Sequence, residues 1–171
     1  MGAHISEEVA DTRLVLDAVR RIVQALHESS RWAEKRLGLT GAQLFVLQKL
    51  AESPCLSLNE LAERTHTHQS SVSTVVARLV ERGLVERGAG ERDARRVELR
   101  LSPEGRRLIR RAPNLPQQRL IQGIERLAPS RRRALAASLD ALSSAMAVKD
   151  REAVMFFDEM KRRRRRPSPH A

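Results

Sequence analysis

The chain has 171 residues, of which 41% are hydrophobic and 31% charged, and its formal net charge is +11. This length suits one compact domain or one protomer of a small oligomer. No apolar run reaches the roughly 18 residues of a membrane span, the first residues lack the pattern of a secretory signal, and the single cysteine, Cys55, excludes an internal disulfide. These features predict a cytoplasmic protein. Because 28 of the basic residues are arginine, an anionic partner is favoured.

The first part of the chain has the periodicity of a helix. Apolar residues recur at three- and four-residue steps from Val9 to Leu26, which predicts one long helix over the first 38 residues that stops at Gly38. Thr40 is a candidate N-cap for a second helix, and Pro54 is expected to end it.

Two short helices joined by a tight turn are predicted next. Ser57 and Glu60 have the spacing of a capping box, and four residues, Thr65 to His68, form the turn. A helix from about Gln69 to Arg82 closes at Gly83, with an apolar inner face of Val72, Val75, Val76 and Leu79. The period then changes to two over 84–87 and 97–101, which predicts two strands around a polar tip at 88–94. Together these elements predict a mainly α protein with a winged helix-turn-helix.

More helices follow the hairpin. Ser102 and Pro103 mark one start, and prolines at 113 and 116 predict a break. Pro129 or Ser130 starts a last long helix, which Leu135, Leu139, Leu142 and Met146 line. Residues 149–160 could extend as a short helix, and 161–171 are predicted to form a disordered basic tail.

Residues 56–105, LSLNELAERTHTHQSSVSTVVARLVERGLVERGAGERDARRVELRLSPEG, resemble the MarR family of bacterial transcription regulators. The motifs that carry the resemblance are LNELAER, RLVERGLVER, Asp93-x-Arg95 and VELRLSPEG, and the likeness extends over roughly residues 5–148. It implies a homodimer in which terminal helices form the interface and two winged domains grip a pseudo-palindromic operator. We therefore expect a helical dimerisation region at 1–39 and 102–148, a DNA-binding domain at 40–101 and a C-terminal extension at 149–171.

The turn and the wing depart from the family pattern. His66 stands where glycine is usual, and histidine tolerates a positive φ better than most residues. Thr67 replaces a valine, and His68 replaces the serine expected to cap the next helix, so Thr67 could cap it instead. At the wing the common Asp-Arg-Arg reads Asp93-Ala94-Arg95, which removes one cation.

The outer face of the second short helix is the candidate DNA-reading surface. Its polar side chains are small enough for the helix to enter a major groove about 12 Å wide, and they are Gln69, Ser70, Ser71, Ser73, Thr74 and Arg78. The plainer alternative is a solvated helix face. The resemblance implies that Arg95 enters the minor groove and that Asp93 orients it, with Arg96 beside them. The alternative for Asp93 and Arg95 is a surface ion pair.

The family also binds small, often aromatic ligands between the dimer helices and the winged domain. Trp32 could line such a pocket, and Arg31 or Arg36 could hold a carboxylate, although a tryptophan at an interface is more often core. Cys55 is either an oxidant sensor or an inert buried thiol. Two histidines in one turn supply too few ligands for a metal, so we expect no metal and no cofactor.

The sequence thus predicts a sequence-specific transcriptional regulator, with repression as the expected sign, whose partners are double-stranded DNA, a second copy and a small effector. A nonspecific architectural DNA binder is the alternative. No phosphate-binding loop, nucleophile arrangement or carboxylate pair indicates an enzyme. The net charge is +1 over 56–101 but +6 over 102–148 and +6 over 161–171. The bulk charge therefore lies outside the winged domain, and the tail is expected to add nonspecific affinity for DNA.

Overall fold

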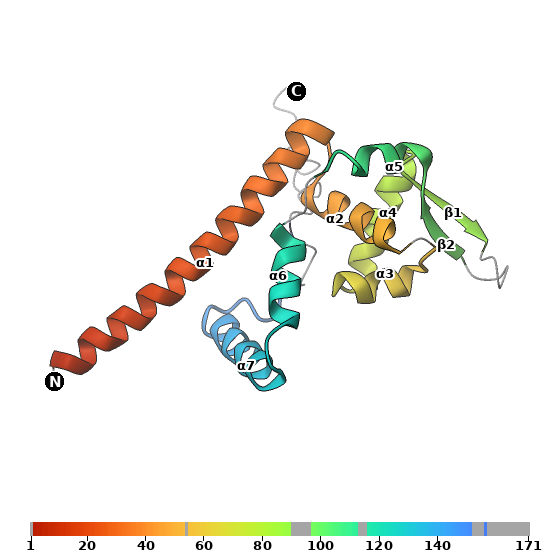
Figure 1. Cartoon of the computed structure of the whole chain (residues 1–171). Coiled ribbons are helices and arrows are strands. Elements are labelled where there is room, and N and C mark those ends of the chain that lie inside the picture. Colours follow the sequence, from red (N-terminus) through yellow and green to blue (C-terminus); the bar gives the residue numbers. More distant parts are fainter. Residues whose placement is uncertain (1, 54, 90–96, 113–115, 152–155, 157–171) are drawn as a thin grey trace, which may run out of the picture.

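A computed structural model describes residues 2–53, 55–89, 97–112, 116–151 and 156, with side chains from residue 9 onward. In chain order the elements are α1 (Gly2–Leu37), α2 (Gly41–Glu52), α3 (Leu58–Thr65), α4 (Gln69–Glu81), β1 (Val85–Ala89), β2 (Val97–Leu101), α5 (Pro103–Ile109), α6 (Pro116–Glu125) and α7 (Pro129–Ala145) (Figure 1). The prediction of a mainly α protein with a small hairpin is confirmed. In the described residues no helix is both long and apolar enough to cross a membrane.

Helix α1 projects away from the rest of the molecule (Figure 1). It ends where Gly38 adopts a φ of +64°, a conformation that costs glycine little. The predicted apolar stripe lies on this helix, but its members before Leu26 are exposed to solvent, Ile22 for instance by 43%. Among the described side chains of α1, from Val9 onward, only those of its C-terminal part, Leu26 and Ala33, are buried apolar residues.

Helix α2 forms the centre of the hydrophobic core. Thr40 is its N-cap, as predicted: the Gln43 amide donates to Oγ1 of Thr40 at 3.2 Å, and Oε1 of Gln43 accepts from the Thr40 amide at 3.0 Å. Leu44, Phe45 and Leu47 are fully buried. The helix ends at Glu52, one residue before its C-cap Ser53, and Pro54 lies outside the described residues.

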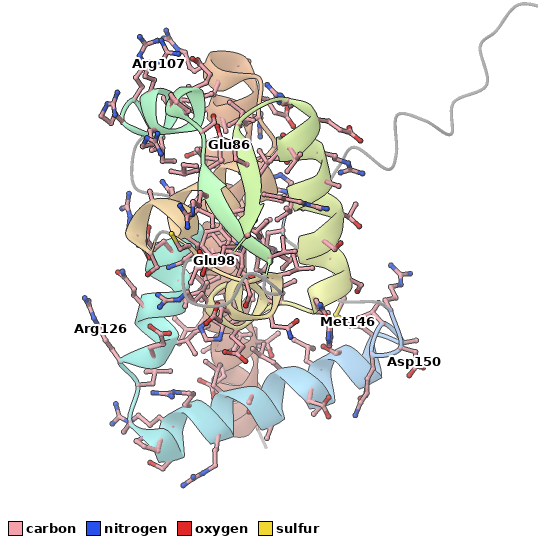
Figure 2. The ribbon with its side chains drawn as sticks, turned by 90° about the vertical axis from the view of Figure 1, so that its right-hand side faces the viewer. Glu86, Glu98, Arg107, Arg126, Met146 and Asp150 are labelled. Atoms are coloured by element: carbon pink, nitrogen blue, oxygen red, sulfur yellow. The ribbon has the colours of Figure 1, made fainter. Side chains whose placement is uncertain are left out.

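The helices after the hairpin follow the proline signals. Ser102 caps α5 by accepting from the Gly105 amide at 2.9 Å, α5 ends at Ile109, and α6 begins at Pro116. Helix α7 has a proline in its first turn and no buried residue, and Met146 lies at its C-terminal end (Figure 2). The predicted short helix over 149–160 is wrong for 149–151, which form a turn and a bend. This result follows from the positive φ of Ala147, which stops helical continuation.

Candidate nucleic-acid interface

The capping box predicted at Ser57 starts α3. The Glu60 amide donates to Oγ of Ser57 at 3.3 Å, and the Ser57 amide donates to Oε2 of Glu60 at 2.8 Å. Two amides that a helix start leaves without helical partners are thus satisfied. Leu61, on the inward face of this short helix, is fully buried, so α3 is fixed both at its start and along its side.

The turn between α3 and α4 depends on a left-handed residue. His66 has φ 50° and ψ 43°, which confirms the expectation that histidine takes the strained position usually held by glycine. His68 is the N-cap of α4 but makes no side-chain cap bond. The suggestion that Thr67 caps α4 instead is wrong, because the N-cap position is held by His68, and the Oγ1 of Thr67 donates to the Thr65 carbonyl at 2.9 Å.

Helix α4 has two faces of opposite character, as the sequence predicted. Its inner face is fully buried and consists of Val72, Val75, Val76 and Leu79. On the outer face Gln69 and Ser70 are exposed, and the partly exposed residues are Ser73, Thr74 and Arg78. Oγ1 of Thr74 donates to the Ser70 carbonyl at 3.1 Å, which leaves the hydroxyl free to accept a further bond. The outer face is therefore polar, with the short hydroxyl side chains of Ser70, Ser73 and Thr74 between Gln69 and Arg78.

Ser71 does not belong to this outer face, and its prediction as a DNA-contact residue is wrong. Its exposed fraction is 6%, and its Oγ is buried without a hydrogen-bond partner in the described part of the chain. The reason is its helical position: Ser71 precedes Val75 by one turn and Leu79 by two, so all three side chains point inward.

A tight helix end carries the chain from α4 into the wing. The Leu84 amide donates to the Leu79 carbonyl at 2.9 Å and the Gly83 amide to the Val80 carbonyl at 2.9 Å, with Gly83 at φ +67°. These are the two bonds of a Schellman motif. β1 and β2 then pair in antiparallel register from Val85 opposite Leu101 to Ala89 opposite Val97.

The wing tip, residues 90–96, lies outside the described residues. Asp93, Arg95 and Arg96 are among them, so their predicted roles in the minor groove stay predictions. The base of the wing is described, and the Leu99 amide donates to the Leu56 carbonyl at 2.8 Å. That bond attaches β2 to the segment just before α3, so the wing and the helix-turn-helix form one packed unit.

Long-range polar contacts fix the unit further, and the sequence analysis missed them. Nη1 of Arg82, the C-cap of α4, donates to the Gly38 carbonyl at 2.6 Å and so ties α4 to the end of α1. His66 lies at 3.2 Å from Glu125 of α6, measured from Nε2 to Oε1. No local sequence motif predicts either contact, because Arg82 and Gly38 are 44 residues apart and His66 and Glu125 are 59 residues apart.

The predicted effector residues fall at the C-terminal end of α1. Trp32 is half-buried and packs against the hydrophobic core, while Arg31 and Arg36 are exposed. Their role in ligand binding stays a prediction. Cys55 is half-buried with a φ of 67°. Within the described residues no three His, Cys, Asp or Glu side chains are grouped so that they could hold a metal ion.

The helix, left-handed turn, second helix and paired strands define a winged helix-turn-helix protein. Residues 37–96 match the family model described as the MarR family. The chain is 35% identical over 97 residues to the HTH-type transcriptional repressor MdtR of Bacillus subtilis (strain 168). The matched stretch is 57% of this chain and spans only 61% of that relative.

Two solved structures are similar in fold over about 80% of this chain. The transcriptional regulator BldR from Sulfolobus solfataricus is 21% identical, with a TM-score of 0.51 and coverage of 80% of this chain and 97% of that one. A mutant MarR from E. coli complexed with operator DNA is 24% identical, with a TM-score of 0.50 and coverage of 80% and 95%. At these identities the likeness supports the fold alone. The sequence matches show similarity to the MarR family over part of the chain, residues 37–96 for the family model.

Proposed function

We propose that this protein regulates transcription by binding double-stranded DNA with α4 in the major groove. The outer face of α4 carries this proposal: it presents Gln69 and Ser70 to solvent while its opposite face is fully buried. Because the opposite face of the helix is fixed by the core, its outer polar side chains are presented to DNA without rearrangement of the helix. The curated relative is named a repressor and one structural neighbour was solved with operator DNA, and both names are consistent with this function.

The residues divide into base readers and phosphate contacts. Gln69 suits the bidentate edge of adenine, and Arg78 suits guanine or a phosphate. The hydroxyls of Ser70, Ser73 and Thr74 complete the reading face. In the wing, Arg95 is proposed to enter the minor groove with Asp93 orienting it and Arg96 on the adjacent backbone.

We further propose that the active species is a homodimer. The supporting observation is a set of large apolar side chains left exposed on α1 and α7, including Val15, Val19, Ile22, Leu139 and Met146, the last exposed by 63%. So many large apolar side chains exposed along two helices are unusual on a stable monomer. On this basis the dimerisation region comprises 1–39 and 102–148, the winged domain 40–101 and the extension 149–171.

The proposed mode of control is a change in the spacing of the two winged domains. In a dimer the two α4 helices must reach successive major grooves roughly 34 Å apart. A small aromatic ligand held near Trp32, Arg31 or Arg36 would shift that spacing and release the operator, so the ligand-free protein would repress transcription and the ligand would relieve that repression.

A selection from random-sequence DNA by the purified protein, followed by footprinting, tests this function. We expect a pseudo-palindromic site, and we expect Gln69→Ala to relax the preference at one position of each half-site. Uniform protection of all DNA would instead support a nonspecific architectural binder, and failure to retain any DNA would refute the proposal.

A further inference from the structure

Helix α6 is attached to the winged domain by two side-chain contacts, one with α2 and one with the turn between α3 and α4. Nε2 of Gln118 donates to Oε1 of Glu52 at the end of α2 at 2.7 Å. The imidazole of His66 meets Glu125 at the other end of the same helix, with 3.2 Å between Nε2 and Oε1. Between them Ile121 packs against the core. Positions 118, 121 and 125 share one helical face, so α6 presents a single face to the winged domain.

His66 occupies a backbone conformation that its side chain makes costly. Its φ of 50° suits glycine better than any residue with a β-carbon. Such outliers persist where the surrounding structure holds them, and they often mark functional positions. At this position the imidazole contacts Glu125, which lies 59 residues further along the sequence. Glycine has no side chain and could not make this contact.

We propose that His66 is a positioning residue that couples α6 to the start of the DNA-reading helix α4. His66 lies two residues before His68, the N-cap of α4, so a shift of the turn changes the direction in which Gln69 and Ser70 point. Helix α6 belongs to the proposed dimerisation region. The contact with Glu125 therefore transmits the arrangement of the dimer to the reading face. This inference rests on the proposed function.

The surroundings of the contact indicate an effect on orientation more than on folding. The groove around it is lined by Lys49 and Glu52 of α2 and by Glu63 and Arg64 of α3, and Lys49 already pairs with Glu52 at 2.9 Å. The side chains of His66 and Glu125 are 58% and 54% exposed. A pair this exposed contributes little to global stability. Variants that break it are therefore expected to fold.

Four variants test the proposal on the DNA site selected by the wild-type protein. His66→Gly removes the side chain and relieves the backbone, and Glu125→Ala removes the partner. Both are expected to weaken binding about two- to fivefold, while the melting temperature stays unchanged or, for His66→Gly, rises. The double variant should bind no more weakly than either single one, and Glu125→Gln should bind nearly as well as wild type because its Oε1 can still accept from the imidazole.

A direct contact between His66 and DNA predicts a different pattern. In that case His66→Gly would lower the affinity for DNA, whereas Glu125→Ala would raise it, because the substitution removes a negative charge near a polyanion. Glu63→Ala is the matched control, because it removes an acid from the same groove and should not weaken binding. Wild-type affinity in Glu125→Ala, or additive losses in the double variant, would overturn the coupling. Failure of the wild type to select any site would refute the proposed function itself.

Discussion

Gly105, buried in the first turn of α5, touches the backbone of Leu84, and this contact permits a sharp prediction for Gly105→Ala. A β-carbon at position 105 would lie 2.2 Å from the Leu84 carbonyl oxygen and 3.2 Å from its carbon, where ordinary contact begins at 3.4 Å. The start of α5 and the backbone at Leu84 would have to move apart by about 1.2 Å. Neither partner is the end of a flexible side chain, so the backbone must move.

The displaced segment also holds the wing to the end of α4. Oγ of Ser102 donates to the Gly83 carbonyl at 2.7 Å and accepts from the Gly105 amide, and the Ser102 amide donates to the Leu84 carbonyl at 3.1 Å. Overpacking of this kind costs about 1–3 kcal/mol, and the better helix propensity of alanine returns up to about 1 kcal/mol. We expect a net loss of about 1–2 kcal/mol.

Thermal unfolding followed by circular dichroism measures this loss. For a chain of this size the expected fall in Tm is about 2–8 °C. Gly123→Ala in α6 is the matched control, because nothing lies within 4 Å of its added β-carbon and the substitution should raise stability by about 0.5–1 kcal/mol. A Gly105→Ala protein that melts at or above the wild-type temperature would refute the close-contact argument.

Other predictions concern capping, assembly and DNA contact. Ser57→Ala removes the capping box of α3 and should cost about 1 kcal/mol in denaturant unfolding, whereas an unchanged midpoint would contradict the cap geometry. Val19→Asp places a charge in the exposed apolar stripe of α1 and should shift the protein to monomer in sedimentation, and a dimer that persists would exclude that face from the interface. Arg95→Ala should weaken operator binding strongly at an unchanged Tm; equal affinity would remove the wing arginine from the interface. Deletion of 161–171 should lower the affinity and the slope of its salt dependence while sequence preference is kept, and an unchanged slope would count against the tail.

The sequence by itself determined most of the elements and several of their ends, although β1 runs to Ala89, two residues into the expected polar tip. Thr40, Ser57 and Ser102 cap helices within three residues of themselves, and Gly38 and Gly83 end helices by their own backbone freedom. The alternation over 97–101 likewise produced a strand in the expected place. These signals act over one turn of chain, so no knowledge of packing is needed to read them.

Only the tertiary structure decided which side chains face which neighbour. The side chain of Ser71 points inward because the valine face of α4 packs against the core. The hydroxyl of Thr67 donates to the Thr65 carbonyl, and Thr67 is not the N-cap of α4. The contacts of His66 with Glu125 and of Arg82 with Gly38 arise because the fold brings together residues 59 and 44 positions apart in the sequence. Local sequence patterns cannot predict contacts between residues so far apart in the sequence. Helix α4, which we propose reads DNA, could therefore be found from the sequence, but the long-range contacts that position it could not.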